Sequence, residues 1–418
     1  MKQIVIDGGK KLTGTIKISG AKNSAVALIP AALLSNGIVK IDNVPNISDV
    51  EALEDILVFL GAKVSRQGNL MEIDSSNIVN KEIPRKLSDK LRASYYFMSA
   101  LLGRFKNVTM HFPGGCSIGA RPIDQTLKGY RALGADVEEV GDKVTVTADE
   151  LIGDDIFLDM ASVGATINIL FSACLASGTT IIHNAAKEPE IVNISTFLNN
   201  MGARIKGAGT STITIIGVEK LGSCFTEVIP DRIEAGTYIV AGALMGDNLR
   251  IENLIPKHID SFLSKLDEMG VNMEIGSDYV VVSQTEKLKS VSIKTLGYPG
   301  FPTDLQQPIT PLLCKCTGVS KMEETIYENR YKHIPYLEDM GAKVETVTNR
   351  IAKFKGPIDF VGSHVSATDL RAGACLVLAG LSAEGKTIID NAHYILRGYE
   401  DIIGKLRNVG ASIEINDI

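Results

Sequence analysis

A short pattern recurs six times along this 418-residue sequence, and the fold must accommodate all six copies. In each copy a glycine follows an amphipathic stretch and precedes a run that alternates like a half-buried strand. Glycine adopts the left-handed conformation that ends many helices more readily than other residues do, so each glycine should stand just past a helix. The glycines are Gly61, Gly134, Gly202, Gly270, Gly341 and Gly410, spaced by 73, 68, 68, 71 and 69 residues.

Each copy also contains an apolar segment of helical length that has no polar face. A helix that is apolar all round has to be buried. Each copy therefore predicts a buried helix, a strand, a turn, an amphipathic helix and further strands. The six apolar segments cover residues 24–34, 93–102, 165–176, 235–245, 308–316 and 372–381.

Six such units divide into two sets of three, which indicates two α/β domains. The crossover is expected near residues 230–232, so that residues 21–229 form the first domain and residues 1–20 with 230–418 form the second. The strand at 3–7 is expected to pair within the second domain. A stacked solenoid is the alternative, but repeats of this length exceed common solenoid units, and buried central helices do not suit a one-dimensional stack.

The composition narrows the possible partners. The formal net charge is -6, aromatic residues make up 6% and tryptophan is absent, so neither nucleic acid nor an anionic membrane is an expected partner. The apolar runs are too short for a membrane span and the N-terminus lacks a signal-peptide core, which favours a cytoplasmic protein. The six cysteines lack the paired spacing of a zinc site, and no metal or cofactor is expected.

The starts of the buried helices carry polar and charged residues. A helix start offers free N–H groups and a partial positive charge, and an added Lys or Arg makes it suited to an anion. If both domains point these ends at one cleft, the cleft suits phosphates and carboxylates. For Ser162 and Asp304, each taken alone, helix capping is the favoured interpretation. Capping explains Lys22, Arg92 and Arg371 poorly, because cations are unfavourable at that end.

A glycine-rich loop at 111–124 contains Cys116. The glycines of this loop allow close backbone approach, and a cysteine five residues from Arg121 is placed to be reactive and to contact a substrate. No histidine is adjacent, so a cysteine–histidine hydrolase pair has no local support. The remaining cysteines are interpreted as small core residues. They are Cys174, Cys224, Cys314, Cys316 and Cys375.

Taken together, these motifs resemble the UDP-N-acetylglucosamine 1-carboxyvinyltransferase family over essentially the whole chain. The matching segments are 22–23, 91–94, 113–116, 118–124, 162–166, 184–186, 188–191, 230–234, 301–304, 328–330, 367–372 and 397–400. The resemblance implies a two-domain inside-out α/β barrel of six βαβ-type repeats, with buried helices and with the active site in the cleft between the domains. It also implies that the enolpyruvyl group of phosphoenolpyruvate moves to the 3′-hydroxyl of UDP-N-acetylglucosamine, the first committed step of peptidoglycan precursor synthesis.

The resemblance assigns roles to individual residues. Cys116 corresponds to the acid that protonates phosphoenolpyruvate and is alkylated by fosfomycin. Asp304, at a helix start, is placed to accept the proton of the sugar hydroxyl. Phosphate and carboxylate are expected to be clamped by Lys22, Arg121 and Arg397. The other positions expected to line the substrate pockets are Asn23, Arg92, Pro122, Ile123, Asp124, Gln125, Ser162, Val163, Gly164, Ile326, Arg330, Asp369 and Arg371.

Two positions depart from the family pattern, and three other functions remain as alternatives. Met160 stands where many members have a lysine, and Thr126 stands where a histidine is common, so one substrate contact at each is in doubt. The related shikimate-pathway transferase is disfavoured by the Gly-Gly-Cys loop. A catalytically silent paralogue is disfavoured by the full set of acid, base and clamp residues. A nucleic-acid end-processing enzyme is disfavoured by the acidic balance and the scarcity of aromatics.

Overall fold

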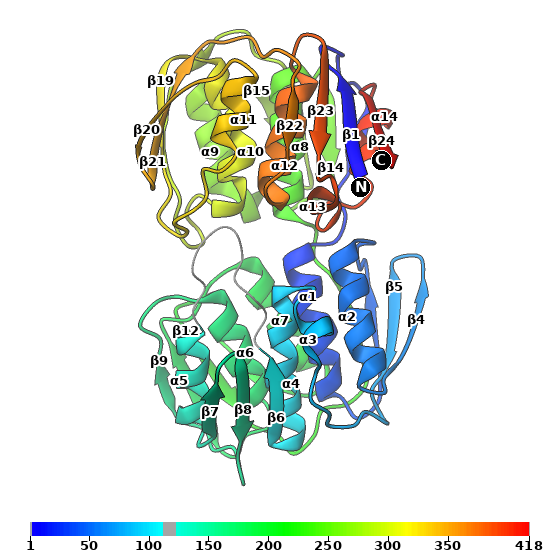
Figure 1. Cartoon of the computed structure of the whole chain (residues 1–418). Helices are drawn as coiled ribbons and strands as arrows, with labels where there is room; N and C mark the ends of the chain where they lie inside the picture. Colours follow the sequence, from blue (N-terminus) through cyan, green and yellow to red (C-terminus); the bar gives the residue numbers. More distant parts are fainter. Residues whose placement is uncertain (1, 112–122, 418) are drawn as a thin grey trace. The chain divides into compact units, whose positions relative to one another are not determined.

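The structure, a computed structural model, describes residues 2–111 and 123–417, and they form two compact units (Figure 1). One unit comprises the described residues of 20–229. The other comprises 2–19 together with 230–417. Each unit has its own hydrophobic core, and the two cores share no residue.

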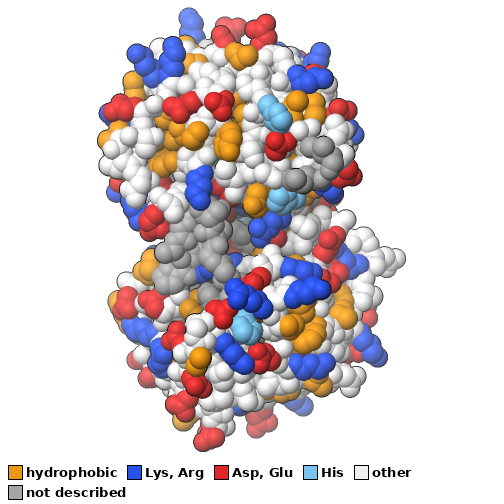
Figure 2. All heavy atoms as spheres, viewed as in Figure 1, with side chains coloured by type: hydrophobic (Ala, Val, Ile, Leu, Met, Phe, Trp, Pro, Cys, Tyr) orange, Lys and Arg blue, Asp and Glu red, His pale blue; other side chains and the backbone are white. Residues whose placement is uncertain are grey.

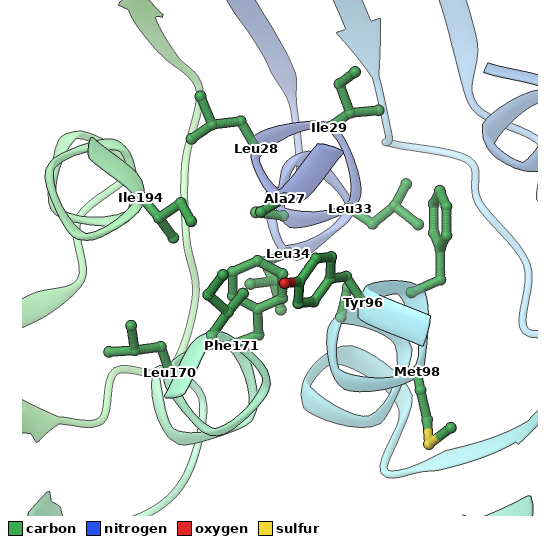
Figure 3. Close-up of a cluster of buried hydrophobic side chains, with 14 of the residues drawn as sticks. Ala27, Leu28, Ile29, Leu33, Leu34, Tyr96, Met98, Leu170, Phe171 and Ile194 are labelled. Carbon is green, nitrogen blue, oxygen red and sulfur yellow. The ribbon is translucent and has the colours of Figure 1, made fainter. Parts of the chain in front are cut away.

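Three central helices form the interior of the 20–229 unit. They are α1 (Lys22–Ala31) with its extension η1 (Ala32–Leu34), α4 (Tyr96–Phe105) with the preceding turn η2 (Arg92–Tyr95), and α6 (Val163–Ala173). Every residue from Ser24 to Leu34 is buried. Side chains of the three helices meet in Figure 3, where the rings of Tyr96 and Phe171 lie 6.2 Å apart between centroids. The absence of a polar face therefore correctly predicted burial.

The 230–417 unit repeats this arrangement. Its central helices are α8 (Arg232–Met245), α10 (Gln306–Lys315) with the preceding turn η4 (Thr303–Leu305), and α12 (Leu370–Leu381). Each of the three contacts the other two. Shorter helical pieces in the two units are α3 (Arg85–Ser88), η3 (Pro256–Ile259) and α13 (His393–Leu396).

An amphipathic helix follows the buried helix in every repeat. These helices are α2 (Ser48–Phe59), α5 (Asp124–Ala132), α7 (Pro189–Asn200), α9 (Asp260–Met269), α11 (Ile334–Asp339) and α14 (Ile402–Asn408). A repeated glycine stands just beyond each one, and all six glycines have φ between 82° and 106°. The prediction of left-handed glycines at helix ends is confirmed.

Three sheets cover the helices of the 20–229 unit. Their strands are β3 (Ile38–Asp42), β4 (Lys63–Gln67), β5 (Leu70–Asp74), β6 (Asn107–His111), β7 (Asp136–Val140), β8 (Lys143–Thr147), β9 (Asp155–Phe157), β10 (Thr179–His183), β11 (Arg204–Lys206), β12 (Thr212–Ile216) and β13 (Cys224–Glu227). The strand orders are β13-β3-β5-β4, β6-β8-β7 and β11-β12-β10-β9. Buried positions alternate along the strands, as at Thr180 and Ile182 of β10, so one face of each sheet packs on the helices.

Three further sheets cover the 230–417 unit. Their strands are β1 (Lys2–Asp7), β2 (Thr15–Lys17), β14 (Leu249–Glu252), β15 (Asn272–Ile275), β16 (Tyr279–Ser283), β17 (Leu288–Lys289), β18 (Ser292–Lys294), β19 (Cys316–Glu323), β20 (Lys343–Thr348), β21 (Ile351–Gly356), β22 (His364–Ser366), β23 (Lys386–Asp390) and β24 (Ser412–Asp417). The orders are β22-β23-β1-β24, β15-β16-β14-β2 and β17-β19-β21-β20, with β18 beside β19. The first strand of the chain thus pairs antiparallel with β23 and β24.

The surface charges, the lengths of the apolar helices and the burial of the cysteines can each be compared with what the sequence predicts. Basic and acidic side chains are interspersed over both units on the face shown in Figure 2. Among the described residues, no helix combines the length and the apolar character needed to cross a membrane. The core interpretation is confirmed for four cysteines, whereas Cys224, on the edge strand β13, is partly buried and packs against the core of the 20–229 unit. The four buried cysteines are Cys174, Cys314, Cys316 and Cys375.

Candidate active site

The predicted site residues fall into two groups, one in each unit. Cys116, Arg121 and Pro122 lie outside the described residues. The 20–229 unit holds Lys22, Asn23, Arg92, Ile123, Asp124, Gln125, Ser162, Val163 and Gly164. The 230–417 unit holds Asp304, Ile326, Arg330, Asp369, Arg371 and Arg397.

The three central helices of the 20–229 unit begin at the same end of that unit. η2, which leads into α4, contacts α1. A Cβ added at Gly164 would lie 1.7 Å from the hydroxyl of Tyr95, so the start of α6 packs directly on η2. At their other ends, Leu34, Arg104 and Ala176 line one cavity. The residues at the helix starts therefore gather at one end of the unit.

Cations occupy the C-terminal ends of these helices. Arg104 donates to the carbonyls of Leu33 and Ser35, at 2.8 and 2.7 Å, and Lys106 donates to that of Gly103 at 2.7 Å. Burial lowers the pKa of both Arg104 and Lys106. These cations satisfy carbonyls that a helix end leaves without partners and complement the helix dipole. The positive ends of the three dipoles consequently point toward the cluster of helix starts.

Lys22 is held at the first position of α1 by a buried carboxylate. Its Nζ lies 2.7 Å from Oδ2 of Asp49, which stands in the first turn of α2 and is 3% exposed at its side chain. This ion pair offsets the unfavourable position of a cation at a helix start. The side chain of Lys22 keeps 14% of its exposure, so the ammonium group is fixed in place near the surface.

The start of α5 is tied to the segment that precedes α6. Gln125 is 7% exposed; its Nε2 donates to Oδ2 of Asp159 at 3.0 Å, and its Oε1 accepts from the Asp159 N–H at 2.8 Å. Asp124 is exposed and Ile123 is partly buried. Of the two departures from the family pattern, Thr126 is buried and Met160 is 60% exposed. Within this unit, the amide of Gln125 thus makes a structural contact.

The start of α6 shows a conventional cap. Oγ of Ser162 accepts from the backbone N–H of Ala165 at 3.3 Å, so the capping interpretation of Ser162 is confirmed. Val163 and Gly164 follow it and are partly buried. Asn23 and Arg92, at the starts of α1 and η2, are also partly buried. A substrate could reach all of these positions from the same end of the unit.

In the 230–417 unit, Asp304 lies between two buried guanidinium groups. Its Oδ1 is 2.9 Å from Nη2 of Arg330, and its Oδ2 is 3.2 Å from Nη2 of Arg371. The arginine side chains are only 2% and 3% exposed, whereas that of Asp304 is 27% exposed. The capping interpretation of Asp304 is wrong, because Pro302 and Leu305 occupy the cap positions of η4 and α10. Its carboxylate instead binds cations from two other segments.

Asp369 holds the backbone of Arg371 at the start of α12. Its Oδ1 accepts from the backbone N–H groups of Arg371 and Ala372, at 2.9 and 3.0 Å, and so caps α12. Its Oδ2 accepts from Nε2 of Gln307 at 3.3 Å. Asp369 is 8% exposed, and the contacts described here are structural. Arg397, just past α13, is partly buried, and Ile326 is 40% exposed.

Within the 230–417 unit, the carboxylate of Asp304 lies between the oriented guanidinium groups of Arg330 and Arg371. Among the described residues, Nε of Arg330 and Nη1 of Arg371 are buried without a hydrogen-bond acceptor. Buried N–H donors normally have partners, and an anionic ligand would supply them. No group of three or more His, Cys, Asp or Glu residues in the described part of the chain is placed to hold a metal ion. The site thus suits acid–base chemistry on an anionic substrate.

Three contributors were not identified from the sequence. Thr303 accepts from Arg330 and donates to Glu324, and His333 contacts Gln307 and Thr310. Thr303 stands inside a matching motif and could have been considered on that ground. Glu324 and His333 carried no signal, because their contacts join separate segments of the chain.

His333 makes the stability of the 230–417 unit depend on pH. Burial lowers the pKa of His333 from 6.5 to about 4, so the folded state binds fewer protons than the unfolded chain between these values. Stability is therefore present above pH 6.5 and is lost as the pH falls toward 4, by up to about 3 kcal/mol. We expect the free energy of unfolding in urea to show this loss.

The matched variant is His333→Gln, which cannot titrate. Its stability should be lower at pH 7 but should fall less between pH 6.5 and 4 than that of the wild type. Burial raises the pKa of Glu234 to about 7, which acts in the opposite direction but equally in both proteins. Parallel curves for the two proteins would contradict the assignment to His333.

Known proteins resemble this chain over nearly its whole length. A family model described as EPSP synthase (3-phosphoshikimate 1-carboxyvinyltransferase) matches residues 6–406. The UDP-N-acetylglucosamine 1-carboxyvinyltransferase 1 of Streptococcus agalactiae is 51% identical over 99% of this chain and 99% of its own. The UDP-N-acetylglucosamine 1-carboxyvinyltransferase 2 of Listeria innocua is 53% identical over 98% of this chain and 97% of its own.

Solved structures agree with the repeat-based fold. The crystal structure of the enolpyruvyl transferase NikO from Streptomyces tendae superposes with a TM-score of 0.90 at 29% identity, covering 99% of each chain. EPSP synthase from Acinetobacter baumannii superposes with a TM-score of 0.75 at 18% identity, which bears on the fold alone. The predicted α/β fold of six repeats with buried helices is confirmed.

Proposed function

Because this chain belongs to the enolpyruvyl transferase family, among the UDP-N-acetylglucosamine 1-carboxyvinyltransferases, we propose that it transfers the enolpyruvyl group of phosphoenolpyruvate to the 3′-hydroxyl of UDP-N-acetylglucosamine and releases phosphate. The proposal is carried by the identity of 51% and 53% to relatives of that name over nearly full length. The reaction commits the sugar to peptidoglycan precursor synthesis. The enzyme works in the cytoplasm on small molecules, without nucleic acid or membrane as a partner.

The reaction needs an acid and a base. Phosphoenolpyruvate is a weak electrophile until its methylene carbon gains a proton, which Cys116 donates. The sugar hydroxyl oxygen bonds to the adjacent carbon as its proton passes to Asp304. The bond to phosphate then breaks while the new methyl group returns one proton to the Cys116 thiolate, which restores the double bond. Asp304 passes the hydroxyl proton to the departing phosphate, so Asp304 and Cys116 return to their starting protonation states and atoms and charges balance.

The three cations of the clamp bind the anionic groups of phosphoenolpyruvate. Lys22, Arg121 and Arg397 bind its phosphate and carboxylate, and they stabilise the charge that develops as phosphate leaves. The fixed position of the Lys22 ammonium beside Asp49 supports this role. The buried donors of Arg330 and Arg371 that lack acceptors in the described chain support a nearby anion as well.

Asp304 is suited to act as the base because its orientation is fixed. Both of its oxygens are held by guanidinium groups, and its side chain is nevertheless 27% exposed. A base held in one orientation can meet the hydroxyl proton without reorganising during the reaction. The remaining predicted positions, from Asn23 and Arg92 to Ile326, line the two substrate pockets in this proposal.

A phosphate-release assay tests the proposal. Release should require both phosphoenolpyruvate and UDP-N-acetylglucosamine and should fail with either one alone. Release with 3-phosphoshikimate as the acceptor instead would indicate the shikimate-pathway transferase. No release with any acceptor would indicate a silent paralogue.

The clamp assignment of Arg397 predicts a selective defect. Arg397→Lys keeps the charge but loses the planar fork that binds a carboxylate or phosphate through two hydrogen bonds. We expect the KM for phosphoenolpyruvate to rise about 10-fold or more, while the Kd of UDP-N-acetylglucosamine stays within about 2-fold. Steady-state kinetics and calorimetry measure the two quantities. An equal loss for both substrates would remove Arg397 from the clamp.

A further inference from the structure

The buried carboxylate of Glu324, which is linked to Asp304 through Thr303 and Arg330, has no role in the chemistry described so far. Glu324 directly follows β19 and is 0% exposed. Its Oε1 accepts from the hydroxyl of Thr295 at 3.0 Å and from the backbone N–H groups of Ile326 and Tyr327, at 2.7 and 3.1 Å. Its Oε2 accepts from the hydroxyl of Thr303 at 2.8 Å. All four of these donors are neutral groups.

The hydroxyl of Thr303 links this carboxylate to the catalytic cluster. Its oxygen also accepts from Nη1 of Arg330, at 3.1 Å. Thr303 has a single hydroxyl proton, and because that proton points to Glu324, its lone pairs face Arg330. The chain of contacts therefore runs from Glu324 through Thr303 to Arg330, whose Nη2 binds Oδ1 of Asp304 at 2.9 Å.

These contacts fix the plane of the Arg330 guanidinium. Nη1 is held by Thr303 and Nη2 by Asp304, which are neighbours in the same turn, η4. A planar group held at two of its nitrogens keeps little freedom to rotate.

A purely structural explanation covers only half of this geometry. Through Oε1, Glu324 ties down the turn at 324–327, and any buried acceptor there would do the same. Oε2 accepts its hydrogen bond from Thr303, which lies on a different segment of the chain. The two oxygens of Glu324 thus have separate partners, and the second points toward the base.

We propose that Glu324 is a positioning residue for the transfer reaction, holding Arg330 against Asp304 through the hydroxyl of Thr303. The inference rests on the proposed function, in which Asp304 is the base. It predicts that the relay can be broken at Thr303 without disturbing the turn at 324–327.

The test compares Thr303→Val with Thr303→Ser. Valine matches threonine in shape but cannot bridge Glu324 and Arg330, so kcat should fall about 10- to 100-fold, with the KM of each substrate within about 3-fold. Serine keeps the hydroxyl and should restore at least about a third of the wild-type kcat. Glu324→Gln should resemble the valine variant, because its amide oxygen can serve the turn while its NH₂ cannot accept from Thr303.

Thr295→Val is the matched control. It removes a hydroxyl bond to Oε1 of the same carboxylate and an acceptor for the N–H of Thr325, so it should lower the melting temperature. It leaves Thr303, Arg330 and Asp304 in place, and its kcat should stay within about 2-fold of the wild type. A kcat loss in this control equal to that of Thr303→Val would overturn the inference.

Crystal structures separate this inference from the proposed function. Arg330 should leave Oδ1 of Asp304 in Thr303→Val and keep that contact in Thr303→Ser. An unmoved Arg330 in the valine variant, or a valine variant with full kcat, would overturn the inference. A wild-type protein that does not turn over the two substrates would refute the proposed function, while the structures would still decide the positioning role.

Discussion

Cys116→Ser is expected to lose most of its turnover, and Cys116→Asp is expected to keep a substantial part. A positioned general acid contributes about 10²- to 10⁴-fold, and a serine hydroxyl is a far weaker acid than a thiol. A carboxyl group of similar reach can donate a proton if its site keeps it protonated. Phosphate release under saturating substrates measures both variants. Full activity in Cys116→Ser would show that Cys116 is not the acid.

Labelling with fosfomycin tests the same residue through its reactivity. The wild type should gain one adduct at Cys116, located by peptide mass, and Cys116→Asp should gain none. The other cysteines serve as internal controls, because burial raises the pKa of Cys174 and Cys314 to about 12 and that of Cys224 and Cys316 to about 11. Their thiols stay protonated at neutral pH. An adduct at the half-buried Cys224 would contradict the assignment.

The repeat pattern predicted the fold because the signals that carried it are local. A left-handed glycine after a helix, and a helix with no polar face, are decided within one segment of the chain, and all six glycines have positive φ. The observed helix boundaries differ from the predicted ones where a tight turn precedes a helix. The segment expected at 93–102 is the turn η2 followed by α4, which ends at Phe105.

The sequence identified a site residue only where the residue type is unfavourable at its position in the local secondary structure. Lys22 and Arg371 stood out because cations are unfavourable at helix starts. The partners of these cations could not be predicted from local sequence, because Asp49 lies on the helix after that of Lys22 and Asp304 lies on a different repeat from Arg371. Asp304 itself fitted a helix cap, and the two arginines that bind it come from distant segments. Glu324 and His333 matter only through contacts of that kind.

Asp304→Asn is expected to lower kcat about 10²- to 10⁴-fold, because the amide cannot take the hydroxyl proton. The protein should also be destabilised, since Arg330 and Arg371 lose a negative partner while they remain buried. Phosphate-release assays under saturating substrates and thermal unfolding measure the two effects.

The charge-matched control for Asp304→Asn is Glu323→Gln. Glu323 lies at the end of β19 and pairs with Lys294 and Lys321 at 3.0 and 3.4 Å, in contacts that are partly exposed. Exposed pairs of this kind contribute little to stability, so this variant should keep its kcat and its KM for phosphoenolpyruvate. If Asp304 only oriented the two arginines, Asp304→Asn would keep most of its kcat and show a raised KM for phosphoenolpyruvate instead. The division of the effect between kcat and KM therefore separates a base from a carboxylate that merely positions cations.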